Sequence, residues 1–321
     1  MPLIRILAVG FLIIVSQPVL ALQTLEPSRA RLSRGEHQVV INDVRLWYRV
    51  AGRATGTPVV FLHGGPGQGS QSFAYFVGPF LERHNRMIYL DQRGAGRSER
   101  PWNEAYSIDL MVDDLEALRR AWRVPRIAVV GHSFGTILAL EYASRYPNRV
   151  AHVVVAGSAP DIPAAFDIQC AQLERDDPPA YARAVAAKPE GWTARCDMTR
   201  AYRGAEGERI LTSFMFPNPE TANLLKEADE RGGLRNTGVV GGVLFRQGLL
   251  TYRFTHPENV RAPLLVIAGS RDRQAVPQPQ RALARAVSNG RIVEYEGAGH
   301  FMWVEQPERF ARDVSAFLHG N

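Results

Sequence analysis

The chain has 321 residues, of which 45% are hydrophobic and 22% are charged, a balance typical of a globular protein with a sizeable core. This composition excludes wholesale disorder. The formal net charge is +6, but the basic residues are scattered without a run of five or more, so the pattern favours a solvated basic surface over a nucleic-acid-binding patch.

The first 21 residues have the pattern of a secretory signal peptide. Arg5 precedes an apolar run over residues 6–15, and the small-residue pattern Val19-Leu20-Ala21 suits signal peptidase. The apolar run is shorter than the roughly 20 residues that a membrane-spanning helix needs. We therefore predict cleavage near Ala21, a periplasmic or secreted protein, and no stable membrane span after cleavage; an uncleaved anchor is the alternative.

Predicted strands and helices alternate through the first half of the chain, and Asn42-Asp43 between the first two strands is a hairpin signal. Such alternation predicts an α/β fold, with a mostly parallel sheet flanked by helices. The predicted strands span residues 38–41, 44–50, 58–62, 86–90, 127–130 and 150–156, and the predicted helices span 107–122 and 134–146.

The alternation stops at about residue 158. From there to about His256 the chain is polar, rich in Arg, Ala and Pro, and only weakly periodic. We interpret residues 158–256 as a helical cap inserted over the sheet edge at which ligands bind in open α/β folds. The core then consists of residues 36–157 and 257–321, with later strands at 264–268 and 291–295 and a final helix marked by Phe310, Val314, Phe317 and Leu318.

The segment Gly131-His132-Ser133-Phe134-Gly135 matches the G-x-S-x-G pattern of a serine nucleophile. A predicted strand enters it and a predicted helix leaves it, so the serine sits on a tight turn and its hydroxyl projects above the sheet. Glycines on either side let strand and helix approach closely. Ser133 is therefore the candidate nucleophile, weighed against a plain turn with an exposed serine.

A serine hydroxyl is a weak nucleophile without a base, which a third group must orient. His300, in the loop after the last predicted strand, is the candidate base. Asp272, after the strand at 264–268, is the candidate carboxylate that orients it. Asp161, after the preceding strand, is the rival acid.

The loop His63-Gly64-Gly65-Pro66-Gly67 follows the predicted strand at 58–62. Its glycines let backbone N–H groups turn toward a ligand. We predict an oxyanion hole at Gly64 and Gly65, with the N–H of Gly65 and that of Phe134 as donors. A phosphate-binding loop is the alternative, but the Lys-Ser/Thr pair of a P-loop is missing.

Together with Asp91-Gln92-Arg93-Gly94-Ala95-Gly96-Arg97-Ser98, these motifs resemble the proline iminopeptidase family of α/β hydrolases over about residues 39–158 and 264–318. The chain order Ser, Asp, His is also that of α/β hydrolases. The resemblance implies the α/β-hydrolase fold with a helical cap, and a Ser-Asp-His enzyme that cleaves N-terminal residues of small peptides or related amides, without metal or cofactor. It also implies that Asp91 and Arg93 brace loops and do not catalyse.

The cap departs from the family pattern. An aminopeptidase must hold the free ammonium of its substrate, and no motif for this is recognisable; Trp192 stands alone. The alternatives are a carboxylesterase or lactonase of the same fold, and a non-catalytic hydrolase-fold protein that binds a small ligand. In every case the partner is a small molecule or short peptide, and the oligomeric state stays open. The acids of the cap segment include Glu174, Glu206, Glu208, Glu227 and Glu230.

The two cysteines, Cys170 and Cys196, leave two alternatives. An exported protein would keep them as a disulfide, whereas two separate buried thiols fit the sequence equally well. Two cysteines alone do not build a structural zinc site, and no HExxH motif is present, so we predict no metal site.

Overall fold

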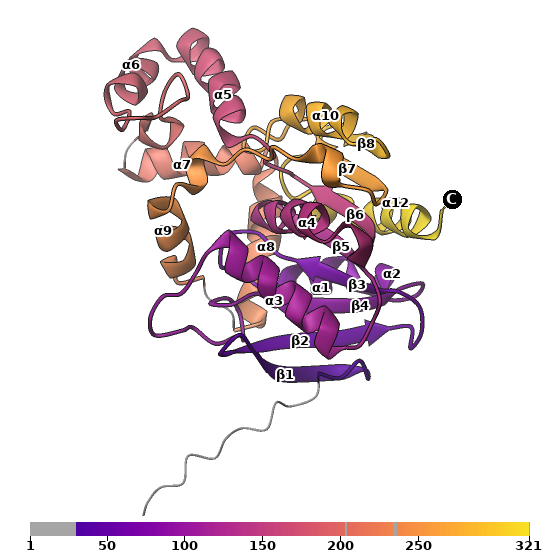
Figure 1. The fold of residues 1–321 in the computed structure, drawn as a ribbon. Helices are drawn as coiled ribbons and strands as arrows, with labels where there is room; N and C mark the ends of the chain where they lie inside the picture. Colours follow the sequence, from indigo (N-terminus) through magenta and orange to yellow (C-terminus); the bar gives the residue numbers. More distant parts are fainter. Residues whose placement is uncertain (1–29, 203, 234–235, 321) are drawn as a thin grey trace, which may run out of the picture.

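The computed structural model describes residues 30–202, 204–233 and 236–320 (Figure 1). The predicted signal peptide, residues 1–21, lies outside the described residues. No helix within the described ranges is long and apolar enough to cross a membrane. Because the structure does not describe the segment around Ala21, cleavage there stays a prediction.

Within these ranges the strands form a sheet of eight, in the order β1-β2-β4-β3-β5-β6-β7-β8. The pairs β1–β2 and β2–β4 are antiparallel, and all neighbouring pairs from β4 onward are parallel. This mostly parallel sheet confirms the predicted fold class. The strands are β1 Gly35–Ile41, β2 Val44–Gly52, β3 Pro58–Leu62, β4 Arg86–Asp91, β5 Ile127–His132, β6 Val150–Ala156, β7 Leu264–Gly269 and β8 Gly290–Tyr295.

The predicted hairpin is present between β1 and β2. Ile41 pairs with Val44, so Asn42 and Asp43 alone form the turn. Both have a positive φ, 46° and 62°, as a two-residue turn of type I′ requires. Asn and Asp tolerate this conformation better than other residues with side chains, which explains why the sequence signal was correct.

Helices cover both faces of the sheet. Successive residues of a strand point to opposite faces, and apolar residues on both faces need to be covered. In β3, Val60 and Leu62 pack with α3, α4 and α10, whereas Val59 and Phe61 pack with α1, α2, α11 and α12. The sequence analysis did not predict α1, α2, α10 and α11; α1, α2 and α11 have six residues or fewer, too few for a helical period to stand out. The core helices are α1 Gln71–Phe76, α2 Gly78–Leu81, α3 Ile108–Ala121, α4 Phe134–Arg145, α10 Pro277–Ala286, α11 Met302–Glu305 and α12 Pro307–His319, with short 3-10 turns at Pro147–Arg149 and Pro257–Asn259.

Between β6 and β7 the chain forms the helices of the cap, which stand beyond one end of the strands (Figure 1). The first three of them share a buried apolar cluster, within which Cys170 and Cys196 form a disulfide with their Cα atoms 5.9 Å apart. The alternative of two separate thiols was therefore wrong. The cap elements are α5 Ile162–Asp176, α6 Pro178–Ala186, α7 Gly204–Met215, α8 Pro219–Arg231 and α9 Val239–Arg246, with 3-10 turns at Met198–Arg200 and Leu249–Thr251.

Candidate active site

Ser133 lies in the turn between β5 and α4, with φ 51° and ψ −122°, a conformation that residues with side chains rarely adopt. The turn is tight. A Cβ on Gly131 would come within 2.5 Å of the carbonyl oxygen of Gly135, and a Cβ on Gly135 within 2.1 Å of that of Leu62. Both positions therefore require glycine, because β3, β5 and α4 meet there.

Asp272 and His300 follow β7 and β8, and the two side chains are hydrogen-bonded. Nδ1 of His300 lies 2.8 Å from Oδ2 of Asp272, and both residues are 2% exposed. The other carboxylate oxygen, Oδ1, accepts from the backbone N–H of Gln274 at 2.9 Å and of Ala275 at 2.8 Å. The carboxylate is thus fixed in place. It holds Nδ1 of His300 as the donor, which leaves Nε2 as the acceptor nitrogen.

The end of β6 separates the serine turn from the histidine ring. The N–H of Ser133 donates to the carbonyl of Ala156 at 3.0 Å. A Cβ on the next residue, Gly157, would lie 3.0 Å from Nδ1 of His300. No hydrogen bond joins Ser133 to His300 among the described residues, as is common for catalytic pairs in enzymes without substrate. The structure therefore brings Ser133, Asp272 and His300 to one edge of the sheet, with the His–Asp hydrogen bond formed.

His132 supports the histidine loop from beneath. Its Nε2 donates to the carbonyl of His300 at 3.0 Å, and its ring packs against Phe301 and Trp303. Burial holds the pKa of His132 well below its usual range, and the charge of a protonated His300 would lower it further. His132 is therefore a neutral donor that fixes the loop and does not compete for the role of base.

The predicted oxyanion donors surround the serine. A Cβ on Gly64 would lie 2.9 Å from Cβ of Ser133, so the glycine loop passes directly beside it. Gly65 lines the cavity above the serine with φ 113°. Neither its N–H nor that of Phe134, the first residue of α4, donates to another described residue. Both residues line the same cavity as Ser133, and neither N–H has a partner among the described residues.

A buried pair of side chains locks the glycine loop to the loop after β4. His63 and Gln92 exchange three hydrogen bonds of 3.0 to 3.1 Å, two of them between the Gln92 carboxamide and the His63 backbone. In the third, Nε2 of His63 accepts from the N–H of Gln92. Burial lowers the pKa of His63, which keeps this nitrogen unprotonated.

Asp91 and Arg93 brace the same region, as the resemblance implied. Asp91 is fully buried and accepts from the N–H and hydroxyl of Ser70 and from the N–H and guanidinium of Arg97. Arg93 forms two hydrogen bonds, of 2.6 and 2.7 Å, with the carboxylate of Asp114. Both side chains form their hydrogen bonds with residues other than Ser133, and their role is structural.

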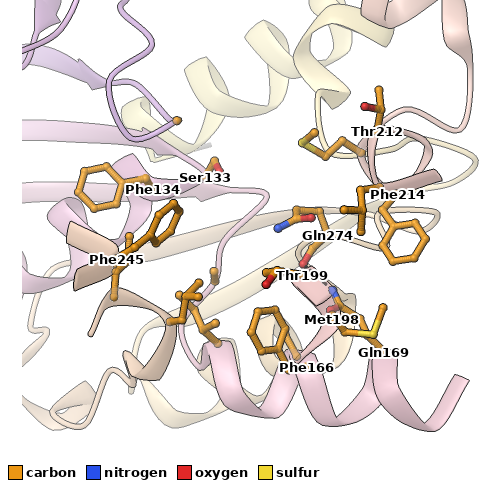
Figure 2. Close-up of a pocket in the computed structure, with 18 of the residues that line it drawn as sticks. Ser133, Phe134, Phe166, Gln169, Met198, Thr199, Thr212, Phe214, Phe245 and Gln274 are labelled. Atoms are coloured by element: carbon orange, nitrogen blue, oxygen red, sulfur yellow. Dashed lines mark hydrogen bonds between the residues drawn. The ribbon is translucent and has the colours of Figure 1, made fainter. Parts of the chain in front are cut away.

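A cavity of about 540 Å³ opens above Ser133 between core and cap (Figure 2). Figure 2 shows Phe134 and Phe245 near the serine, and Phe166 and Phe214 farther off on cap helices. None of the described residues that line the cavity carries a charge. They are Gly65, Pro66, Ser133, Phe134, Ile137, Ala159, Ile162, Ala165, Phe166, Gln169, Met198, Thr199, Tyr202, Gly204, Gly207, Leu211, Thr212, Phe214, Met215, Phe245, Leu249, Leu250 and Gln274.

The acids weighed from the sequence lie elsewhere. Asp161 caps α5 by accepting from the N–H of Ala164 at 2.9 Å, and it pairs with Arg253 at 3.1 Å, so it is not the partner of the histidine. Three cap glutamates are exposed and form ion pairs on the cap surface, namely Glu174 with Arg195, Glu227 with Arg231 and Glu230 with Lys226. The side chains of Glu206 and Glu208 lie outside the described residues.

Sequence reasoning missed what the cap contributes to the site. The carbonyl of Met215, at the end of α7, accepts from the N–H of His300 at 2.9 Å, and that of Phe214 accepts from the N–H of Arg273 at 2.9 Å. Phe216 stacks on Phe301, with ring centroids 4.9 Å apart. The end of α7 therefore touches both candidate catalytic loops. These are mostly backbone contacts, for which the weakly periodic cap sequence carries no signal.

Comparison with known proteins places this geometry in a family. The model of the α/β hydrolase fold family matches residues 57–307. A proline iminopeptidase of Thermoplasma volcanium is 23% identical over 296 residues, covering 91% of this chain and 99% of that protein. A 2-hydroxymuconate semialdehyde hydrolase of a Pseudomonas species is 29% identical over 271 residues, covering 82% and 87%.

A solved structure supports the same fold. The proline iminopeptidase-related protein of Thermus thermophilus superposes with a TM-score of 0.72 at 23% identity, covering 89% of this chain and 98% of that one. The resemblance to the proline iminopeptidase family, first drawn from short motifs, is thus confirmed over most of the chain. Two of these three similar proteins are named for iminopeptidases and one for another hydrolase, so the likeness favours hydrolysis more strongly than any one substrate.

Proposed function

The chain belongs to the α/β-hydrolase fold family, and on this premise we propose that it is a serine hydrolase that passes the acyl group of its substrate first to Ser133 and then to water. The observation that carries the proposal is the 2.8 Å hydrogen bond between buried Asp272 and His300, at the same sheet edge as a serine held in a strained turn. A serine, a base and a carboxylate that orients the base are the three parts that this chemistry needs.

In the first half of the proposed reaction, Oγ of Ser133 attacks the carbonyl carbon while Nε2 of His300 takes its proton. Asp272 stabilises the imidazolium that results. The carbonyl oxygen becomes an oxyanion, which accepts hydrogen bonds from the N–H groups of Gly65 and Phe134. His300 then gives the proton to the leaving alcohol or amine, and the acyl group stays on Ser133.

In the second half, His300 removes a proton from water, and the resulting hydroxide attacks the acyl-enzyme. The same two N–H groups hold the second oxyanion. When it collapses, the bond to Oγ breaks, His300 returns its proton to Ser133, and the carboxylic acid product leaves. The positive end of helix α4, which begins at Phe134, also favours the negative charge that develops in both halves.

The cavity favours an ester with an uncharged acyl group as the substrate class. A charged group transferred into an apolar cavity loses its hydration and needs a counter-charge there. The described lining supplies none, whereas Phe134, Phe166 and Phe245 supply apolar surface. We therefore expect hydrolysis of neutral acyl esters, including lactones, of a size that a cavity of about 540 Å³ accommodates.

A second candidate function is removal of N-terminal residues from small peptides. It is favoured by the HGGPG and DQRGxGRS motifs and by the proline iminopeptidase relatives. It requires a carboxylate near the cavity for the substrate's ammonium. Glu206 and Glu208, on either side of the lining residue Gly207, are the cap acids that this hypothesis would use.

Two measurements test the serine hydrolase. A fluorophosphonate should phosphonylate the wild-type protein once with loss of HF, at Ser133 on peptide mapping, and should not modify the Ser133→Ala variant. A panel of p-nitrophenyl esters and of prolyl and alanyl p-nitroanilides then ranks the substrates. We expect the esters to be cleaved, and activity that survives in Ser133→Ala would overturn the proposal.

The same panel separates the two candidate functions. Prolyl anilide turnover above ester turnover, lost in Glu206→Gln or Glu208→Gln, would favour the peptidase. Ester turnover that is unaffected by these two substitutions would favour the esterase. Specific binding of esters without acylation of Ser133 would instead indicate a non-catalytic binding protein.

We also propose that the protein is exported. Its disulfide supports this, because such bonds persist mainly in oxidising compartments such as the periplasm. Intact mass of protein recovered from a secreting host tests the proposal. We expect a chain that begins after Ala21, and recovery of the full chain still beginning at Met1 would contradict cleavage.

A further inference from the structure

The cavity above Ser133 is mostly apolar, but besides Ser133 it is lined by a set of polar side chains, here called the polar region. This region consists of uncharged side chains, from the cap and from the loop that holds Asp272. Its members are Gln169, Thr199, Tyr202, Thr212 and Gln274. Gln169 is buried, Tyr202 and Thr212 are partly buried, and Thr199 and Gln274 are exposed.

Two members of this region are already engaged by the protein. The carboxamide of Gln169 donates to the carbonyls of Arg273 at 2.7 Å and of Gln274 at 3.1 Å. The hydroxyl of Thr199 donates to Oδ1 of Asp197 at 2.6 Å. These two side chains therefore have a structural role. Gln169 holds the Gln274 loop, and Thr199 holds the turn before α7.

Gln274 and Thr212 differ from Gln169 and Thr199 in their hydrogen bonding. Neither the carboxamide of Gln274 nor the hydroxyl of Thr212 forms a hydrogen bond with another described residue. The backbone of Gln274 is nevertheless fixed, since its N–H donates to Asp272 at 2.9 Å and its carbonyl accepts from Gln169. Figure 2 shows its carboxamide reaching into the cavity between Ser133 and the cap. A rigid backbone thus presents this carboxamide to whatever fills the cavity.

From this we propose, resting on the serine hydrolase function above, that Gln274 and Thr212 bind an uncharged oxygen-bearing group on the acyl part of the substrate, such as a keto, hydroxyl or amide group. The substrate class is then an ester whose acyl chain has an apolar portion near Ser133 and a neutral polar group farther along. A carboxamide both donates and accepts but carries no charge, so it matches such a group and offers no counter-charge to a carboxylate or an ammonium.

Matched pairs of p-nitrophenyl esters test this substrate class. Each pair has one chain length and differs only in a keto group: pentanoate with 4-oxopentanoate, hexanoate with 5-oxohexanoate, and heptanoate with 6-oxoheptanoate. The measured quantity is the ratio of kcat/KM for the keto ester to that for the plain ester. For the best pair we expect a ratio of about 5 to 10, the size of one neutral hydrogen bond.

The variant Gln274→Met keeps the length of the side chain and removes its polar atoms. We expect the ratio to fall to about 1 in this variant. Gln278→Met is the matched control, because Gln278 is exposed on α10 and outside the cavity lining, and it should keep the wild-type ratio. A ratio near or below 1 for every wild-type pair, or a wild-type ratio retained in Gln274→Met, would overturn the inference.

Two further measurements separate a neutral acyl group from a charged one, and the polar site from the serine hydrolase proposal. The monoadipate and 6-aminohexanoate p-nitrophenyl esters present a carboxylate and an ammonium, and faster cleavage of either than of 5-oxohexanoate would contradict a neutral acyl group. If neither esters nor anilides are cleaved and the fluorophosphonate does not label Ser133, the serine hydrolase proposal fails. The polar site is then judged by calorimetric titration of Ser133→Ala with ethyl 5-oxohexanoate and ethyl hexanoate. Tighter binding of the keto ester, lost on adding Gln274→Met, supports the site, and equal binding rejects it.

Discussion

The core and the cap of this protein hold their side chains in different ways. At the strand ends of the core, charged groups are buried and fully engaged: Arg93 and Asp114 form a bidentate pair with side chains only 2% and 4% exposed. On the cap, the pairs Arg195–Glu174 and Lys226–Glu230 are open to solvent. Buried pairs are costly to break, whereas exposed pairs contribute little.

This difference matches a division of labour. The candidate catalytic groups lie on loops that are fixed by several hydrogen bonds each, mostly from the core, with one from α7 to each of the Asp272 and His300 loops, as an active site requires if its geometry must not change. The cavity walls come largely from helices whose main internal constraints are one disulfide and a small apolar cluster. The comparison predicts that changes in the core alter catalysis and global stability, whereas changes in the cap alter the choice of substrate and local stability.

The largest expected effect is on catalysis in the core. Asp272→Asn should lower kcat/KM for p-nitrophenyl hexanoate by about 10⁴, because an amide at this position stabilises the wrong histidine tautomer. Asp161→Asn is the control, since that side chain only caps α5 and pairs with Arg253, and it should change kcat/KM by less than about tenfold. Equal losses in the two variants would remove the distinction between the two acids.

The next largest expected effect is on stability. It is tested by removing one ion pair from the core and one from the cap. Arg93→Met leaves the carboxylate of Asp114 buried without its cation and should lower the free energy of unfolding by about 3 to 5 kcal/mol. Arg195→Met, in the cap, removes an exposed pair and should have a much smaller effect. Urea denaturation of both variants measures the two values. Similar losses would mean that core and cap do not differ in this way.

The disulfide gives a prediction for the cap alone. Cys170→Ala combined with Cys196→Ala opens a loop with a sequence separation of 26 residues and should cost about 3 to 4 kcal/mol in the entropy model. If the cap sets substrate choice, kcat/KM should fall more for p-nitrophenyl hexanoate than for the acetate, which needs little of the cavity. A parallel fall for both esters would place the disulfide's effect on the core instead.

Much of the core could be predicted from the sequence, because its steric and backbone requirements act at single positions. Gly131 and Gly135 stand where a Cβ would collide with backbone, and Asn42-Asp43 occupy a turn that needs positive φ. Such requirements restrict the residue type at one position, so a short motif carries them. The candidate acid and base were also predictable, because parallel strands deliver the loops after their carboxyl ends to the same edge.

The contacts that the cap makes with the site could not be predicted from the sequence in the same way. The contacts of α7 with the His300 loop use backbone carbonyls of Phe214 and Met215, which no side-chain pattern encodes. The role proposed for Gln274 rests on the absence of a partner for its carboxamide among the described residues, whereas the carboxamide of Gln169 donates to two carbonyls. Only the spatial arrangement distinguishes these two glutamines. Likewise, the pairing of Cys170 with Cys196 was one of two equal alternatives until the distance was known.

The smallest predicted effect concerns pH and again separates the regions. Burial depresses the pKa of His63 and of His132, both in the core, below the value of about 6.5 that an unfolded histidine has. Above about pH 6.5 both states are neutral and these groups add no pH dependence. Below it the unfolded chain binds protons that the folded protein refuses, so the free energy of unfolding falls as the pH falls. Each histidine contributes a slope of at most about 1.4 kcal/mol per pH unit.

The substitution His132→Gln should make this decline between about pH 6.5 and pH 5 shallower, since glutamine does not titrate. His256→Gln is the matched control, because His256 is exposed next to Glu258 at the end of the cap segment and should leave the decline nearly unchanged. Thermal unfolding measured across this pH range compares the three proteins. If both variants keep the wild-type slope, the acid sensitivity does not arise from His132 beneath the His300 loop.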